Sequence, residues 1–332
     1  MKQLLAPLVG DASPVTVIGL CKNAGKTTAM RRLMAELGEE CLGLTSVGRD
    51  GECTDLVTGT EKPDLYLKKR RSVRHSAGYA HPVRCHAGGG GSHRRDDPPG
   101  AGGGVPHPVR RICAAGRAVG GRAAPPLTRR FQELGAQRVL IDGAAGRKSL
   151  AGAGVEGVAL LCTGASLDRD MELVVAETAH TCWLFARKRP ESAALCAALD
   201  GQEARFALFT PEGEPVELPL EESGAPKWNK LPRRPLVLWA AGGIMDPLLK
   251  TLARRGAPTT LVAADATHVL AGRAALDLFL RNGGELRVRR ELTIAAVGAN
   301  PWSAYGWHFE PDKFVRALRE VIDLPVVNVK ED

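Results

Sequence analysis

The segment from Val15 to Gly38 most constrains what this chain can fold into. An apolar, mostly β-branched run, Val15–Ile18, ends at Gly19, and a polar loop then leads into a stretch with apolar residues at helical spacing, namely Met30, Leu33, Met34 and Leu37. A spacing of three and four residues places such side chains on one face of a helix, and glycine commonly follows a helix end. The pattern predicts a buried strand, a tight loop and a helix in direct succession.

The loop has the composition of a phosphate-binding loop. It is GLCKNAGKTT, with the spacing G-x5-G-K-T in place of the commoner G-x4-G-K-[ST]. Gly25 lets the backbone approach a phosphate closely, and loop amides can point at the phosphate oxygens. We predict that Lys26 reaches the β- and γ-phosphates of ATP and that Thr27 is a Mg²⁺ ligand. The predicted nucleotide contacts are Gly19, Lys22, Asn23, Ala24, Gly25, Lys26, Thr27 and Thr28. The alternative is an ordinary glycine-containing turn between a strand and a helix.

Two carboxylates are candidates for the acidic partners of this loop. Asp50 lies in a polar turn after an expected strand, Leu42–Val47, and Asp142 ends the apolar strand in QRVLIDG. A carboxylate at the carboxyl end of a buried parallel strand can orient magnesium or a water molecule. We therefore predict Lys26, Asp50 and Asp142 as catalytic and Thr27, Asp50 and Asp142 as metal ligands. A solvated turn remains the alternative for Asp50, and a turn cap for Asp142.

Alternating strands and helices predict an α/β protein with a parallel P-loop NTPase sheet flanked by helices, and a second, smaller α/β domain. We place the nucleotide-binding domain at 1–204, a hairpin and proline-bounded linker at 205–234, and the accessory domain at 235–332. Residues at predicted strand ends of the second domain, Asp265, Thr267, Asn300 and Pro301, are candidate site residues, although turn chemistry at the strand ends is the better explanation of them. The nearby Trp302, Tyr305 and Trp307 suggest a local hydrophobic plug or a partner surface.

Residues 71–126 do not resemble the rest of the chain. They contain nine Arg, no Lys, Leu, Glu or Thr, and five of the eight His, and they carry +7 of the net charge of +8. A segment so rich in Gly, Ala, Pro and Arg cannot bury enough apolar surface to offset its ordering entropy. Three interpretations remain open: a frameshifted stretch between two compensating indels, a natural disordered linker, and a nucleic-acid-binding arm.

Cysteine usage and hydropathy bear on localisation. The eight cysteines form no CxxC pair and no zinc-finger spacing with histidine, and no run of eighteen apolar residues occurs. We expect a soluble, cytoplasmic protein without a disulfide framework, structural zinc or membrane association.

The motifs GLCKNAGKTT, LTSVGRDGE, EKPDLYL, DGAAGRKS and NPWSAYGW together resemble the P-loop (KamB-type) reactivase subunit of adenosylcobalamin-dependent lysine 5,6-aminomutase. The longer loop is also similar to those of dethiobiotin synthetase and the cobyrinic acid synthetase group. The resemblance covers most of the chain except residues 71–126, and GANP stands where the family would have an apolar-Thr-Val-Asn-Pro sequence.

The resemblance implies an ATP- and Mg²⁺-dependent switch, an ATPase, that reactivates a cobalamin-dependent aminomutase together with a second reactivase subunit. A second hypothesis is an ATP-dependent carboxylate ligase of the dethiobiotin synthetase type. Nucleic-acid binding is a third, and it depends on residues 71–126 being genuine sequence. Nucleotide preference, client identity and oligomeric state stay open at this level.

Overall fold

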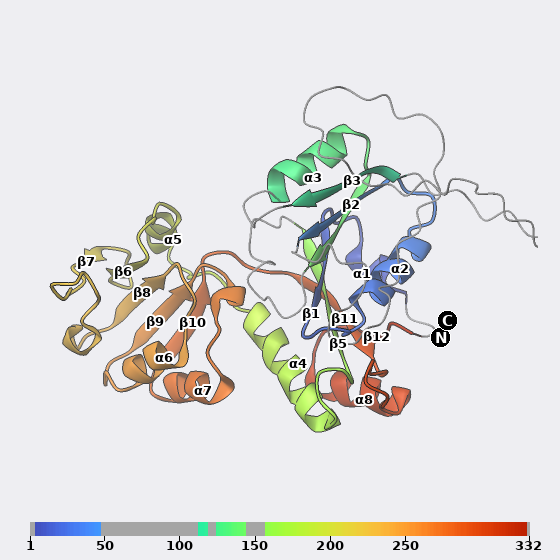
Figure 1. Cartoon of the computed structure of the whole chain (residues 1–332). Coiled ribbons are helices and arrows are strands. Elements are labelled where there is room, and N and C mark those ends of the chain that lie inside the picture. Colours follow the sequence, from blue (N-terminus) through green and yellow to red (C-terminus); the bar gives the residue numbers. More distant parts are fainter. Residues whose placement is uncertain (1–3, 48–111, 119–123, 144–156, 331–332) are drawn as a thin grey trace, which may run out of the picture.

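Figure 1 shows the computed structural model, which describes residues 4–47, 112–118, 124–143 and 157–330 and contains two β-sheets. The first sheet has seven strands in the order β12-β11-β5-β1-β4-β2-β3, and all of its paired strands are parallel. Its strands are β1 (Val15–Gly19), β2 (Leu42–Val47), β3 (Ile112–Ala118), β4 (Arg138–Gly143), β5 (Val158–Gly164), β11 (Ile294–Asn300) and β12 (Val326–Asn328). The predicted α/β class with a parallel sheet is confirmed.

Helices bury both faces of this sheet, which explains why its central strands are mostly apolar. The helices of this part are α1 (Ala6–Val9), α2 (Lys26–Glu36), α3 (Ala124–Glu133), α4 (Met171–Phe185) and α8 (Pro311–Val321). Alternate residues of β1 enter opposite cores: Val17 packs in the cluster that contains residues of α2, and Ile18 in the cluster that contains residues of α4 and α8. The apolar residues predicted to form one face of α2 are all buried.

The order of the strands reverses beside β1. From β1 the chain first goes to one side, to β2 and β3, returns to β4 next to β1, and then continues on the other side with β5. In open parallel sheets, ligands bind outside the carboxyl ends of the strands at such a reversal. The loop after β1 therefore occupies the position where this architecture places a ligand.

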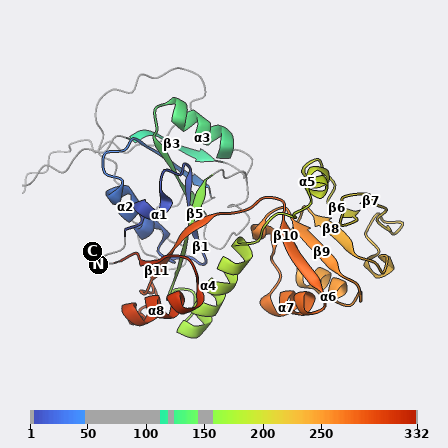
Figure 2. The same cartoon turned by 180° about the vertical axis from the view of Figure 1, so that it is seen from behind.

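The second sheet is mixed and has the order β10-β9-β8-β6-β7. Strands β8 to β10 are parallel to one another, whereas β6 pairs antiparallel with both β8 and β7. Its elements are α5 (Ala193–Asp200), β6 (Phe206–Phe209), β7 (Pro215–Val216), η2 (Trp228–Lys230), β8 (Leu236–Ala240), α6 (Asp246–Ala253), β9 (Thr259–Ala263), η3 (Ala266–His268), α7 (Arg273–Arg281) and β10 (Gly284–Val288). Helix α4 lies between the two sheets (Figures 1 and 2).

The domain boundaries differ from those predicted. The expected linker 205–234 contains β6 and β7, which pair into the second sheet, and the expected accessory domain 235–332 is divided between the two sheets. Strands β11 and β12 return to the first sheet, where β11 pairs with β5. The second sheet is thus an insertion. The sequence of an apolar run such as Ile294–Asn300 does not indicate which of the two sheets the strand will join.

Two predictions about atypical residues also need correction. Within the anomalous segment 71–126, residues 112–118 form the edge strand β3 against β2, and α3 begins at Ala124; the remainder of that segment lies outside the described residues. Cys41 forms a disulfide bond, whereas the sequence predicted a protein without a disulfide framework.

Two chain segments cross between the sheets, and they are hydrogen-bonded to each other. The Val288 amide donates to the Lys188 carbonyl at 3.1 Å. Glu291 accepts from the Lys188 ammonium at 2.8 Å and from the Arg189 amide at 3.1 Å. Figure 2 shows the returning segment, in orange, running from β10 to β11. The two crossings therefore form one paired connection.

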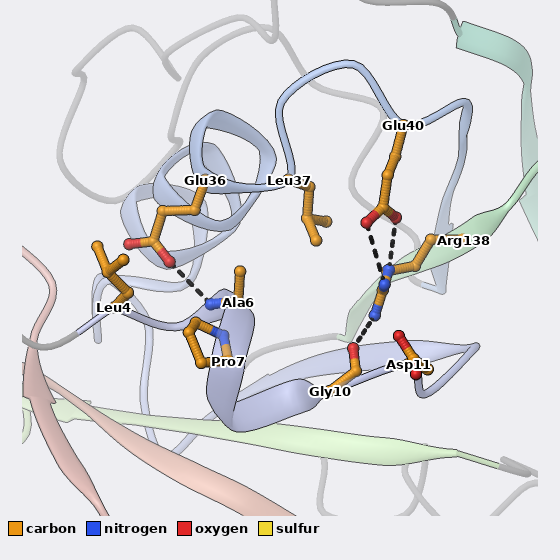
Figure 3. Close-up of a pocket in the computed structure, with 9 residues that line it drawn as sticks. All are labelled: Leu4, Ala6, Pro7, Gly10, Asp11, Glu36, Leu37, Glu40 and Arg138. Atoms are coloured by element: carbon orange, nitrogen blue, oxygen red, sulfur yellow. Dashed lines mark hydrogen bonds and ion pairs between the residues drawn. The ribbon is translucent and has the colours of Figure 1, made fainter.

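A cavity of about 550 Å³ opens at the amino end of β4, the end opposite to Asp142. Figure 3 shows Arg138 reaching across it to the Glu40 carboxylate, with nitrogen–oxygen distances of 2.8 and 3.1 Å. The Arg138 guanidinium also donates to the carbonyls of Gly10 and Ala12, and the Glu36 carboxylate accepts from the amide of Ala6. These contacts hold the α1 segment against the end of α2. The polar groups that line this cavity therefore stabilise the fold.

Replacing Arg138 by alanine should lower the free energy of unfolding by about 2–3 kcal/mol, because a buried guanidinium with carboxylate and carbonyl partners is removed. Denaturant unfolding followed by circular dichroism measures this. Lys188→Ala is the matched control: it breaks an exposed ion pair of the same 2.8 Å length and should cost less than about 1 kcal/mol. Equal losses in the two variants would contradict the structural role of Arg138.

Candidate functional site

The loop between β1 and α2 turns through two residues with left-handed backbone conformation. Gly25, which precedes α2, has φ +95°, and Asn23 has φ +62°. Glycine adopts this conformation without steric cost, and asparagine tolerates it better than most residues. The predicted strand, loop and helix are therefore present, and the loop meets the amino end of an eleven-residue helix, where free amides favour an anion.

The C-terminal strands of the first sheet pack directly against this turn. A Cβ atom at Gly25 would lie 2.9 Å from Asn300 Cβ and 3.1 Å from Val329 Cγ2. The Asn300 side chain also donates from Nδ2 to the Asn23 carbonyl at 3.1 Å. The loop is thus supported from one side by residues nearly 300 positions away, and only glycine fits at position 25.

Lys26 folds back over the start of its own loop. A Cβ atom at Gly19 would lie 3.0 Å from Lys26 Cδ and 3.1 Å from Lys26 Nζ. The absence of a side chain at Gly19 therefore leaves the space that the lysine stem occupies. The ammonium group is consequently held over the turn rather than extended away from it.

Asp142 lies beside the loop on the neighbouring strand. It pairs in register with Val17 of β1 and is half-buried. A Cβ atom at Gly143 would lie 2.9 Å from the Val17 carbonyl oxygen, so glycine after Asp142 permits the close approach of β4 to β1. Close packing between β4 and β1 therefore explains why glycine follows Asp142 in the sequence.

The Lys26 ammonium and the Asp142 carboxylate both act on the thiol of Cys162, on the other neighbour of β1. Burial raises the pKa of Cys162 to about 12; the charge of Lys26 acts in the opposite direction and that of Asp142 adds to the rise. Burial likewise raises the pKa of Cys21, within the loop, to about 11, against the effect of Lys26. The two thiols stay protonated at neutral pH and are not nucleophiles. Lys26 and Asp142, 116 positions apart in the chain, thus belong to one electrostatic environment.

Two oxygen donors of the kind that magnesium prefers lie on the elements that flank the loop. Mg²⁺ is commonly held by one or two carboxylates together with phosphate oxygens and water. Thr27, half-buried in the first turn of α2, has a hydroxyl group, and Asp142 has a carboxylate. Among the residues that the structure describes, no three His, Cys, Asp or Glu side chains gather as metal ligands.

The other predicted residues divide into two groups. Ala24 is fully buried in the core beneath the loop, whereas Lys22 and Thr28 are half-buried. Asp50, predicted as a catalytic and metal-ligating residue, lies outside the described residues.

Asn300 has a larger role than strand-end turn chemistry. Besides its bond to Asn23, its side-chain oxygen accepts from the Trp302 amide at 3.3 Å, and its carbonyl accepts from the Ala165 amide at 3.0 Å. It therefore ties together the loops that follow β1, β5 and β11. The only sequence signal was a polar residue followed by proline at the end of an apolar run, and Val329 gave no signal at all.

Asp265 and Thr267 lie on the second sheet, at the end of β9. The buried Asp265 carboxylate accepts from the Thr267 amide, from His268 Nδ1 and from the Arg290 guanidinium, each at 3.0 Å. These contacts tie the end of β9 to the returning segment after β10. The interpretation of this pair as strand-end turn chemistry agrees with the geometry.

Gly25→Ala should lower the free energy of unfolding and distort the loop, because the added methyl group meets Asn300 and Val329 at an unfavourable φ. We expect a loss of about 2–4 kcal/mol in denaturant unfolding. Gly38→Ala is the control, since Gly38, just beyond α2, also has a positive φ, +62°, but nothing within 4 Å of the added atom. It should cost only about 1–2 kcal/mol, and equal losses would contradict the close packing at Gly25.

Asp265 should make the stability of the protein sensitive to acid. Burial alone would raise its pKa, but hydrogen bonds from His268 and Thr267 and the charges of His268 and Arg290 outweigh burial and hold the pKa below its ordinary value of 3.8. The ionised carboxylate therefore stabilises the fold above about pH 4, and this contribution disappears as the pH falls through the lowered pKa. Asp265→Asn should be less stable than the parent protein at pH 7, and the difference should narrow below pH 3.8. A constant difference across this range would contradict the lowered pKa.

Comparisons with known proteins leave the geometry as the guide to function. No protein-family model, curated protein or solved structure matches this chain. None of the helices in the described part of the chain is long and apolar enough to span a membrane.

Proposed function

We propose that this chain binds ATP with Mg²⁺ at the loop Gly19–Thr28 and acts as a nucleotide-driven switch on a protein client. The observation that carries the proposal is the combination of a left-handed turn at Gly25, a lysine folded back over Gly19, and a half-buried carboxylate on the adjacent strand. A tight backbone turn with a lysine at a helix amino end suits a polyphosphate. Its position at the strand-order reversal suits a ligand in general.

Each residue has a role that follows from its position. Loop amides and the amino end of α2 would hold phosphate oxygens, and Lys26 would neutralise the terminal phosphates. Thr27 and Asp142 would hold the magnesium ion, which, when bound, offsets the negative charge of the phosphates. Gly25 and Gly143 keep the backbone close enough for these groups to converge.

The connection between the sheets supports a switch rather than a simple binding protein. The loop after β5 contacts Asn300, which contacts the nucleotide loop. Helix α4 follows the loop after β5, spans fifteen residues and ends at the paired crossing near Lys188. A change of contacts at the nucleotide loop therefore has a rigid element through which it can bias the second sheet.

The client follows from the KamB-type resemblance of the motifs. We propose a cobalamin-dependent aminomutase as the client, a second reactivase subunit as partner, and the cytoplasm as the location. Conversion between ATP-bound and ADP-bound states would favour two different arrangements of the second sheet, and the client would respond to their difference.

Purified protein should hydrolyse ATP faster when a cobalamin-dependent aminomutase is present, because the client binds one nucleotide state preferentially. Lys26→Ala should weaken ATP binding about 10- to 150-fold, equivalent to roughly 1.5–3 kcal/mol for a charge-assisted hydrogen bond, and should abolish the stimulation. Calorimetry and a phosphate-release assay measure the two effects.

Lys250→Ala provides the control, since it removes an exposed lysine of α6 on the second sheet and should change neither quantity. If the rate of ATP hydrolysis does not respond to the aminomutase but requires an added carboxylic acid, the result would favour a ligase of the dethiobiotin synthetase type over the switch. Unchanged ATP affinity in Lys26→Ala would contradict the proposal that the nucleotide binds at this loop.

A further inference from the structure

The segment after β11 presents aromatic rings beside the nucleotide loop. Trp302 is 43 % exposed and Tyr305 46 %, in a chain with only five Trp and three Tyr. Trp307 behaves differently: it is half-buried, packs against the core, and donates from its indole nitrogen to the Ala165 carbonyl at 2.9 Å. Trp307 thus fits the predicted hydrophobic plug, and the exposed Trp302 needs a separate explanation.

Trp302 is connected to the nucleotide loop through one side chain. Asn300 donates to the Asn23 carbonyl in the loop at 3.1 Å and accepts from the Trp302 amide at 3.3 Å. Two residues of chain span at most about 7 Å, so the backbone of Trp302 lies close to the turn at Gly25. Asn300 is therefore a positioning residue for both segments.

The C-terminal strand brings a cation to the same place. Val329 packs against Gly25, and the next residue, Lys330, holds its ammonium group over the Trp302 ring, 5.8 Å from the ring centroid. The amide of Lys330 is fixed by the Asn328 side chain at 3.0 Å. Two separate segments contact the loop at Gly25. One continues to Trp302 and the other to Lys330.

The Trp302 ring is held in a defined orientation. It stacks on His308, with 4.6 Å between ring centroids and 22° between the planes, and a backbone bridge joins the same two residues. An orientation fixed by stacking lowers the entropy that a ligand must remove on binding. Indole and lysine together suit a flat, nitrogen-containing aromatic ring with anionic groups nearby.

We infer that Trp302 is the stacking platform for the nucleobase of the nucleotide, with Lys330 beside it. This inference rests on the proposed function, because it assigns the base to a ligand whose phosphates occupy the loop Gly19–Thr28. It divides the site into a phosphate part, built by β1, α2 and β4, and a base part, built by the segments that follow β11 and β12.

Binding of ATP and of inorganic tripolyphosphate, each with Mg²⁺, separates these two parts. In isothermal titration calorimetry, Trp302→Ala should weaken ATP binding about 5- to 150-fold, which corresponds to about 1–3 kcal/mol for stacking of one base. The affinity for tripolyphosphate should not change. Trp302→Phe, which keeps an aromatic face, should recover most of the ATP affinity even if the alanine variant folds poorly.

Tyr305→Ala is the matched control, because Tyr305 is as exposed as Trp302 but stacks on Trp307; it should leave both affinities unchanged. An unchanged ATP affinity in Trp302→Ala, or equal weakening of ATP and tripolyphosphate, overturns the base platform while the phosphate site stands. If the parent protein binds neither ligand, the proposed function fails and the base platform fails with it.

Discussion

The contact of the turn at Gly25 with Asn300 and Val329 is the interaction on which the proposed site depends. A phosphate-binding loop is useful only if its amides are held in one arrangement before the ligand arrives. Here the left-handed turn has Asn300 Cβ and Val329 Cγ2 as near neighbours, and the Asn23 carbonyl is held by a hydrogen bond from the same Asn300. The loop is consequently supported by β11 and β12, the strands that close the first sheet on that side.

This support gives the chain topology a functional meaning. Strands β11 and β12 come after the second sheet in the sequence, so the support of the loop between β1 and α2 is complete only when the chain has left the first sheet, formed the second, and returned. The two crossings are paired through Lys188, Arg189 and Glu291. A protein built this way cannot lose the order of its second sheet without weakening the anchorage of the strands behind the loop. The proposed switch would use this paired connection to transmit a change from one sheet to the other.

Much of the site was accessible from the sequence because its chemistry is local. A strand, six loop residues and a helix share one stretch of chain, and the positions of Gly25, Lys26 and Thr27 follow from spacing alone. Asp142 was also predictable, since a carboxylate and a glycine at the end of an apolar strand form a local pattern. Asn300 was a weaker prediction, because its value comes from contact with Asn23, 277 positions away. Val329 has an apolar side chain that no sequence pattern distinguishes, and its role comes only from packing against Gly25.

The sequence by itself determined the class of the fold, the predicted phosphate-binding loop and the elements on either side of it, because hydrophobic periodicity and glycine placement act within a few residues of chain. Only the tertiary structure decided which sheet each late strand joins, that the second domain is an insertion, and that Lys26 and Asp142 share one environment around Cys162. These facts depend on pairing between distant strands, where many apolar segments are equally able to pair. The energy of the whole packed arrangement, rather than any local preference, selects among them.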